Sequence, residues 1–247
     1  MTGQAEYGAR PWLLVSDIDD TLTGSPDAME RLGAALGRER KRIWFAVNSS
    51  RPAASVARTL REDFPENLAP EAVITALGTE IALDGAPVAA WAARFADWPR
   101  GQIFDCLAAL GHRPHDPEFQ SAAKVSFAVP AAAQPKATQA LADAGLPCRI
   151  IASGRDDFDV IPETAGKDAA ALFLARTLGV PQPRLIVAGD SGNDLAMFRI
   201  AGHAIAVANA RRELLAAMPV DTSYHATRPH AAGVLEGLLR IGALTAA

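Results

Sequence analysis

The chain has 247 residues, of which 49% are hydrophobic, 21% charged and 6% aromatic, and its formal net charge is −4. This composition is that of a folded globular protein and argues against a disordered chain. The 24 Lys and Arg and 28 Asp and Glu residues are mixed along the chain, so nucleic acid and anionic membranes are not favoured as partners. A small molecule is the partner that we expect.

The cysteines and the N-terminal residues predict a cytoplasmic protein. Cys106 and Cys148 belong to no disulfide or metal-binding pattern, which fits a reducing compartment. The N-terminal segment has no apolar run typical of a signal peptide, and the apolar runs elsewhere are shorter than the ~20 residues that cross a bilayer.

Short apolar runs alternate with segments of helical periodicity. The runs that we expect to be strands are Trp12–Val15, Ile43–Val47, Val73–Leu77, Leu185–Ala188 and Ala204–Val207. The segments that we expect to be helices are Ala28–Leu36, Ala53–Asp63, Lys167–Leu178 and Leu195–Ala201. This alternation predicts an α/β fold with a Rossmann-like parallel sheet, in which the functional loops follow the carboxyl ends of the strands.

The middle of the chain does not show this alternation of predicted strands and helices. Residues 84–162 contain Pro and Gly clusters and alternating apolar runs at Lys124–Val129 and Arg149–Ala152. We interpret them as an inserted α+β cap domain, with the core formed by residues 1–83 and 163–247. Closure of such a cap would exclude water from a bound substrate.

Two carboxylates follow the first predicted strand directly. Asp17 and Asp19 lie two residues apart in the segment SDIDDT, where a buried strand leaves the sheet. Negative charges grouped in this way are costly to bury without a cation. Capping of the next helix by Asp20 or Thr21 is the alternative explanation.

A second acidic loop, GDSGND, follows the fourth predicted strand. It contains Asp190 and Asp194, and two acidic loops at one sheet edge suggest a shared divalent cation. Oxygen ligands without His or Cys suit Mg²⁺. The four-residue spacing suits Asp194 to a supporting role rather than to direct binding of the ion. A turn followed by a helix cap would explain this segment without a metal.

Two further segments could hold a phosphate. Asn48, Ser49 and Ser50 follow the second predicted strand at a helix start, where hydrogen bonds can be donated to a phosphoryl oxygen, although such residues are also common helix caps. Lys167 stands at the entrance of a predicted helix, where the helix dipole disfavours a cation. An anionic partner or a solvated surface position would each account for it.

In their order and strand context these segments resemble the haloacid dehalogenase superfamily of phosphohydrolases, and within it the sucrose-phosphate phosphatase family. The segments that carry the closer resemblance are SDIDDTL, GTEI at Gly78–Ile81, Ser153–Pro162 with Gly166 and Lys167, GDSGND, and the late histidine segment His225–Gly233. Relatives commonly have Thr-Gly-Arg after the second strand, where this chain has Ser49-Ser50-Arg51. The serine keeps the hydroxyl, so the resemblance still implies phosphate binding there.

The resemblance implies a haloacid dehalogenase-like, Mg²⁺-dependent phosphatase. Asp17 would be the nucleophile that attacks phosphorus, and Asp19 the acid that protonates the departing sugar oxygen and then activates water. Ser49 and Lys167 would hold the transferred phosphoryl oxygens. The implied metal-site residues are Asp17, Asp19 through its carbonyl, Asp190 and Asp194. The residues expected to bind substrate are Ser50, Arg51, Glu80, Lys124, Asp157, Asp159 and Asn193.

The substrate is less closely defined than the reaction. Sucrose 6-phosphate is the first expectation, and mannosylfructose phosphate, mannosyl-3-phosphoglycerate and trehalose phosphate are alternatives. A phosphosugar mutase and a non-catalytic sugar-phosphate-binding protein are further alternatives. For Glu80, Lys124, Asp157 and Asp159, surface ion pairs would serve equally well as an explanation. Association with a synthase that makes the substrate is conceivable, and we assign no catalytic role to His225 or His230.

Overall fold

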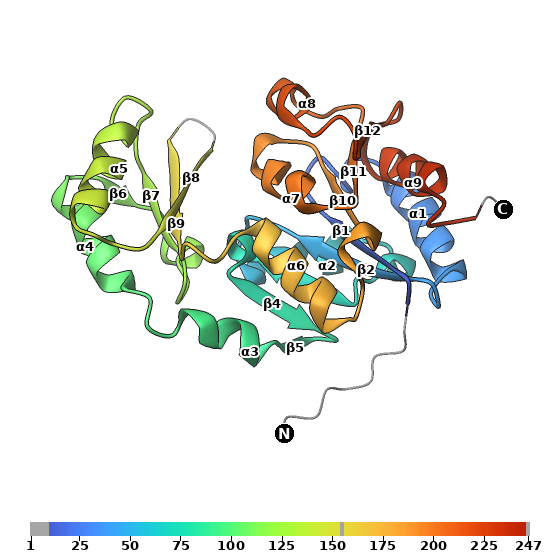
Figure 1. The fold of residues 1–247 in the computed structure, drawn as a ribbon, viewed down its shortest axis with the longest axis horizontal. Coiled ribbons are helices and arrows are strands. Elements are labelled where there is room, and N and C mark those ends of the chain that lie inside the picture. Colours follow the sequence, from blue (N-terminus) through green and yellow to red (C-terminus); the bar gives the residue numbers. More distant parts are fainter. Residues whose placement is uncertain (1–9, 154–155, 246–247) are drawn as a thin grey trace. The chain divides into compact units, whose positions relative to one another are not determined.

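The computed structural model describes residues 10–153 and 156–245 and divides into two compact units (Figure 1). The first unit comprises residues up to 47, 60–72 and from 171 onward, and the second comprises 48–59 and 73–170. Gly154, in the predicted cap-ending segment, lies outside the described residues. The division into a core of 1–83 and 163–247 and a cap of 84–162 stays a prediction.

A parallel sheet forms the centre of the first unit. Its strands, in spatial order, are β12 (Ser223–His225), β11 (His203–Ala206), β10 (Leu185–Gly189), β1 (Trp12–Ser16) and β2 (Ile43–Asn48). Every residue of β1, β2 and β10 is buried, as expected for parallel strands that are covered on both faces. Ser16 at the end of β1 is in register with Ala188 on β10. The parallel pairing confirms the predicted α/β class.

The first unit contains both predicted and unpredicted helices. At predicted periodic segments lie α1 (Pro26–Arg38), most of α6 (Lys167–Thr177) and α7 (Leu195–Ile200), while α2 (Ala53–Glu62), also predicted, belongs mainly to the second unit. The helices α8 (Arg212–Ala217) and α9 (His230–Ile241) were not predicted. Ser25 caps α1 because its side chain accepts a hydrogen bond from the Ala28 amide, and Pro26 occupies the first turn. Helices α1 and α9 pack against each other.

The second unit contains the remaining strands. They are β3 (Ala72–Thr75), β4 (Glu80–Leu83) and β5 (Ala86–Pro87), and a separate antiparallel sheet in the order β6 (Arg113–Pro114), β7 (Val125–Ala128), β9 (Asp157–Ile161) and β8 (Arg149–Ser153). The prediction of a strand as far as Leu77 was wrong at its end. Ala76 and Leu77 have φ of 49° and 59°, so the chain leaves the extended conformation after Thr75.

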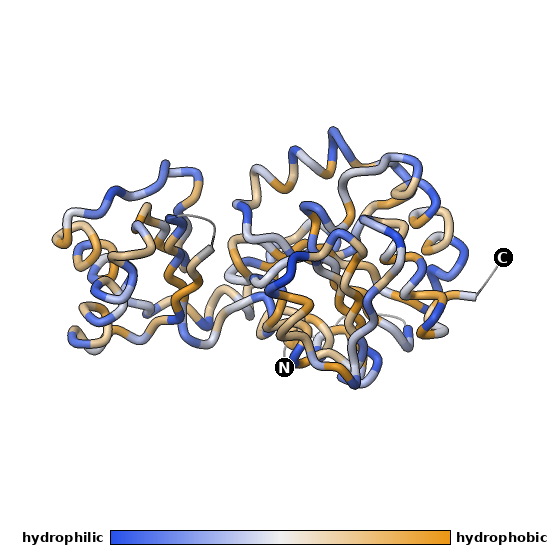
Figure 2. The backbone as a smooth tube through the Cα atoms, turned by 90° about the horizontal axis from the view of Figure 1, so that it is seen from above, coloured by the Kyte–Doolittle hydropathy of each residue, from blue (hydrophilic) through white to orange (hydrophobic). Residues whose placement is uncertain are grey.

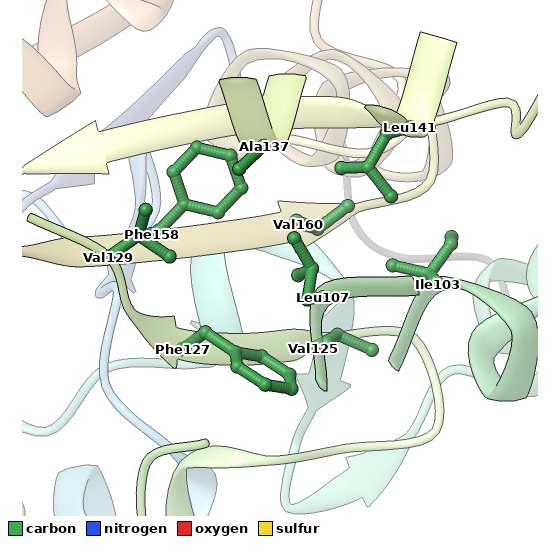
Figure 3. Close-up of a cluster of buried hydrophobic side chains, with 9 residues drawn as sticks. All are labelled: Ile103, Leu107, Val125, Phe127, Val129, Ala137, Leu141, Phe158 and Val160. Atoms are coloured by element: carbon green, nitrogen blue, oxygen red, sulfur yellow. The ribbon is translucent and has the colours of Figure 1, made fainter. Parts of the chain in front are cut away.

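Two helices cover the antiparallel sheet, and together with the sheet they form a small hydrophobic core (Figure 3). These helices are α4 (Arg100–Ala109) and α5 (Gln134–Asp143), and the short helix α3 (Ala89–Ala92) precedes them. The core residues, all at most 1% exposed, are Ile103, Leu107, Val125, Phe127, Val129, Ala137, Leu141, Phe158 and Val160. An independent core of this kind agrees with the predicted α+β character of this stretch.

Short 3₁₀ segments complete the described chain. They are Glu66–Leu68, Ala76–Gly78, Ala93–Phe95, Pro117–Phe119, Gln182–Arg184 and Gly192–Asp194. Hydrophobic stretches alternate with hydrophilic ones along both units (Figure 2). Within residues 10–153 and 156–245, none of the helices has both the length and the apolar character that a bilayer crossing requires.

Candidate active site

Three buried carboxylates meet in the first unit, at the carboxyl ends of β1 and β10. Asp17 follows β1, and Asp190 and Asp194 follow β10. One oxygen of each carboxylate lies within 4.8 Å of the others, and the three residues are 5%, 4% and 0% exposed. Their positions follow from the parallel pairing of β1 with β10, which the Asp17 amide extends by donating a 2.9 Å hydrogen bond to the Ala188 carbonyl. The predicted meeting of Asp17 with Asp190 is therefore found.

Thr21 links the two acidic loops. Its buried hydroxyl is 3.4 Å from Oδ2 of Asp17 and 3.4 Å from Oδ1 of Asp190. A single hydroxyl donates one hydrogen bond at a time, so it is shared between the two carboxylates. From the sequence, Thr21 was predicted only as an alternative helix cap. Its place in the pattern Asp-x-Asp-x-Thr was the available signal.

Asp194 organises the loop after β10. Its Oδ2 accepts hydrogen bonds from the amides of Asp190, at 3.1 Å, and Ser191, at 3.2 Å. Gly189 makes this possible, since a Cβ there would lie 2.6 Å from the Asp194 carboxylate. Asp194 thus fixes the backbone that carries Asp190, which agrees with the supporting role expected for it.

The two other acidic residues after β1 are exposed. Asp19 and Asp20 lie in the turn that leaves the strand, and Asp20 has a φ of 58°. The exposed guanidinium of Arg211 lies 3.9 Å from Asp20 and 3.8 Å from Asp190. Arg211 was not predicted from the sequence, because no motif marks it.

The carboxylate cluster fits a divalent cation. All of its side-chain ligand atoms are oxygens, which Mg²⁺ and Ca²⁺ prefer. Three grouped carboxylates are costly to bury without a positive charge, and the Arg211 guanidinium is 59% exposed and 3.8 Å from Asp190. Asp17, Asp190 and the Asp19 carbonyl are the residues that would hold the ion, with Asp194 behind Asp190.

The two predicted phosphate-binding residues are both buried in the second unit. Ser49 is 1% and Lys167 is 2% exposed, so the surface explanation of Lys167 was wrong. The Asn48 side chain donates a 3.0 Å hydrogen bond to the Lys167 carbonyl, and the Ser49 amide donates to Ile74 of β3. Because a Cβ on Gly78 would lie 2.3 Å from the Gly166 carbonyl, only glycine allows the turn after β3 to pack against the start of α6.

A second group of predicted residues surrounds Lys124. Its ammonium lies 3.1 Å from Oδ1 of Asp159 and 3.5 Å from the Ser50 carbonyl. Ser126 donates a 2.5 Å hydrogen bond to the same Asp159 oxygen. Lys124 and Asp159 are 3% and 7% exposed, so this ion pair is buried, and the surface explanation does not describe it.

The remaining predicted substrate residues have other contacts or positions. Glu80 accepts a 2.9 Å hydrogen bond from Thr75, and the Arg51 guanidinium donates to Thr59 of α2 at 3.1 Å. Asp157 is exposed and lies 3.3 Å from His115, as the surface alternative expected. Asn193 is half-buried in the loop after β10. Their roles toward a substrate stay predictions.

Comparison with solved structures defines the class of protein. A haloacid dehalogenase-like hydrolase protein from Bacillus subtilis superposes with a TM-score of 0.72 at 16% identity, covering 96% of this chain and 94% of that chain. The sucrose-phosphatase of Synechocystis sp. PCC6803, solved in complex with sucrose and phosphate, superposes with a TM-score of 0.86 at 27% identity, covering 96% and 100%. The fold is that of the haloacid dehalogenase-like proteins, as the resemblance implied.

The sequence comparisons identify the family. The family model described as sucrose-6F-phosphate phosphohydrolase matches residues 10–241, and the chain belongs to this family. Sucrose-phosphatase 1 of Nicotiana tabacum is 31% identical over 92% of this chain and 58% of its own length. The mannosylfructose-phosphate phosphatase of Agrobacterium fabrum is 29% identical over 93% of this chain and 96% of its own length. The chain thus spans little more than half of the tobacco relative.

Proposed function

We propose that this chain is a Mg²⁺-dependent phosphatase that hydrolyses a sugar phosphate, with sucrose 6-phosphate as the first candidate substrate. The observation that carries the proposal is the meeting of Asp17, Asp190 and Asp194 within 4.8 Å at the ends of two adjacent parallel strands. Membership of the sucrose-6F-phosphate phosphohydrolase family supports the same reaction.

The reaction consists of two displacements at phosphorus. In the first, a carboxylate oxygen of Asp17 attacks phosphorus, the bond from phosphorus to the sugar oxygen breaks, and Asp19 gives its proton to that oxygen. In the second, Asp19 takes a proton from water, the water oxygen attacks phosphorus, and the bond to Asp17 breaks to release phosphate. When bound, Mg²⁺ offsets the negative charge of the carboxylates and of the phosphoryl oxygens.

The residues of the second unit are assigned to binding. Ser49 and Lys167 are proposed to hold the phosphoryl oxygens, a role that suits a buried hydroxyl and a buried ammonium. Lys124 and Asp159 are proposed to contact sugar hydroxyls, because a paired ammonium and carboxylate offer both donors and acceptors.

Two substrates deserve comparison because relatives with different names match this chain. The tobacco and Synechocystis relatives are named as sucrose-phosphatases. The Agrobacterium relative, named as a mannosylfructose-phosphate phosphatase, matches almost its whole length. Mannosylfructose phosphate is therefore the second candidate substrate.

Phosphate release from a panel of sugar phosphates tests the proposal. We expect the purified protein with Mg²⁺ to release phosphate from sucrose 6-phosphate faster than from glucose 6-phosphate or trehalose 6-phosphate. We expect EDTA to abolish release, and Asp17→Asn to lower it by about 10³-fold or more, because the nucleophile is lost. Absence of release from every member of the panel would contradict the proposal, and a preference for mannosylfructose phosphate would select the second candidate.

A further inference from the structure

The late histidine segment has no part in the reaction described above, yet it contacts the turn that carries Asp19. The carbonyl of Asp20, one residue after Asp19, lies 3.0 Å from Nδ1 of His230. It also accepts a 2.7 Å hydrogen bond from the Asn209 side chain. A carbonyl oxygen only accepts, so the hydrogen lies on Nδ1 of His230, and both lone pairs of this oxygen are used.

Asn209 joins the two sides of this contact. Its Nδ2 donates to Asp20, and its Oδ1 accepts a 3.0 Å hydrogen bond from the His230 amide. These three residues, which we call the Asp20 clamp, come from the turn after β1, the loop after β11 and the first residue of α9. Each member therefore holds another in place.

The backbone around the clamp has positive φ angles and glycines that allow its close contacts. His230 and Asp20 both have positive φ, at 53° and 58°, a conformation that is unfavourable for most side chains. Gly24 has a φ of 118°, and a Cβ there would lie 2.7 Å from the His230 ring. Gly233 lets α9 approach the preceding loop, since its Cβ would lie 2.2 Å from the Arg228 carbonyl. Strained conformations of this kind persist where surrounding contacts fix them.

From these contacts we infer that His230 and Asn209 are positioning residues for Asp19. The inference rests on the proposed function, in which Asp19 transfers the proton to the departing sugar oxygen. Asp19 lies in the same turn as Asp20, so the conformation of this turn sets the direction in which its side chain leaves the backbone. The clamp holds that peptide by the Asp20 carbonyl and so keeps the Asp19 carboxyl where the sugar oxygen departs. Such positioning matters because a misplacement of about 1 Å can cost roughly 100-fold in rate.

Two substitutions at His230 distinguish the effect of losing the Nδ1 hydrogen bond from the effect of a misfolded protein. His230→Gly removes the ring and suits the positive φ. His230→Asn also tolerates that φ, and its amide nitrogen takes the place of Nδ1. Asn209→Ala is the independent variant, at an exposed loop position. Circular dichroism and thermal unfolding check that all three variants are folded.

The kinetic readout is a comparison of two leaving groups. A sugar oxygen requires a proton to depart, whereas p-nitrophenolate does not, and kcat/KM reports the steps up to departure of the leaving group. We expect His230→Gly and Asn209→Ala to lower kcat/KM for the preferred sugar phosphate about 10- to 100-fold. For p-nitrophenyl phosphate we expect a change of less than about 3-fold, and His230→Asn should restore most of the lost activity. Equal losses on both substrates, or no loss on either, would overturn the positioning role.

Hydrogen exchange tests the clamp without relying on catalysis. We expect amides of the turn that contains residues 19–24 to exchange at least about 10-fold faster in His230→Gly than in the wild type, with His230→Asn close to the wild type. Unchanged exchange would overturn the clamp even in an active phosphatase. If the wild type hydrolysed neither substrate while exchange responded as expected, the proposed function would fail and the clamp itself would stand.

Discussion

Among individual residues, Thr21 shows most clearly how the site depends on a side chain outside the predicted set. Its hydroxyl lies 3.4 Å from both Asp17 and Asp190, so it helps to keep two like charges at a fixed separation. Hydrogen bonds of this kind, one step removed from a metal ion, orient the ligands that bind it.

Replacing Thr21 by valine should weaken cation binding. Valine has nearly the same shape but no hydroxyl, so the two carboxylates lose their shared donor. We expect the dissociation constant for Mg²⁺, measured by isothermal titration, to rise about 10-fold. Thr21→Ser keeps the hydroxyl and should remain within about 3-fold of the wild type. Equal affinities of all three proteins would show that Thr21 does not orient the site.

His203 on β11 gives a prediction about pH. Burial lowers the pKa of His203 below its ordinary value of 6.5, and the nearby Arg184 guanidinium lowers it further. The unfolded chain therefore binds a proton at a higher pH than the folded protein does. The stabilisation is fully present above pH 6.5 and is lost as the pH falls from there toward the lowered pKa.

Replacement of His203 by glutamine removes this titration. We expect the urea midpoint of the wild type to decrease between pH 7 and pH 5 more steeply than that of His203→Gln. The two proteins should show parallel curves between pH 7.5 and 8.5, where His203 is neutral in both states. Identical slopes at acidic pH would mean that the His203 pKa is the same in the folded and unfolded chains.

The secondary-structure elements of the fold were predictable to different degrees. Strands β1, β2 and β10 are continuous apolar runs, which is the signature of a parallel strand buried on both faces. Strand β9 (Asp157–Ile161) was not predicted as a separate strand, because it begins with alternating acidic residues, which are uncommon in strands. The end of β3 was mispredicted because Ala76 and Leu77 are apolar yet have positive φ.

The candidate site likewise contains residues that the sequence could predict and residues that it could not. Asp17 and Asp190 were predictable because parallel strands place their carboxyl ends side by side. The Asp20 clamp was not predictable, since it depends on loop conformations that no periodic pattern encodes. The sequence pointed to Lys124 and Asp159 only through a family resemblance, and their pairing required the register of the antiparallel sheet.

The β7–β9 region offers a test of whether Lys124 and Asp159 serve binding or stability. Removing one partner of a buried ion pair leaves the other uncompensated, so Lys124→Met should lower the free energy of unfolding by about 3 kcal/mol. The double variant Lys124→Met with Asp159→Asn should recover much of that loss. If these residues also contact sugar hydroxyls, the KM for the sugar phosphate should stay raised in the double variant. Recovery of KM together with stability would assign the pair to folding alone.

At the scale of the whole molecule, the fold joins residues that are distant in the chain. Thr21 and Asp190 are 169 positions apart, and they meet because β1 and β10 are neighbours in one parallel sheet. The proposed reaction therefore requires that Asp17 takes up the phosphoryl group at this junction.

Trapping the phosphorylated protein tests that claim most directly. Rapid acid quenching during turnover of a ³²P-labelled sugar phosphate, followed by peptide mapping, locates the covalently bound phosphoryl group. We predict label on the peptide that contains Asp17, and none in Asp17→Asn or after removal of Mg²⁺ with EDTA. Label on another residue, or undiminished labelling of Asp17→Asn, would contradict the account.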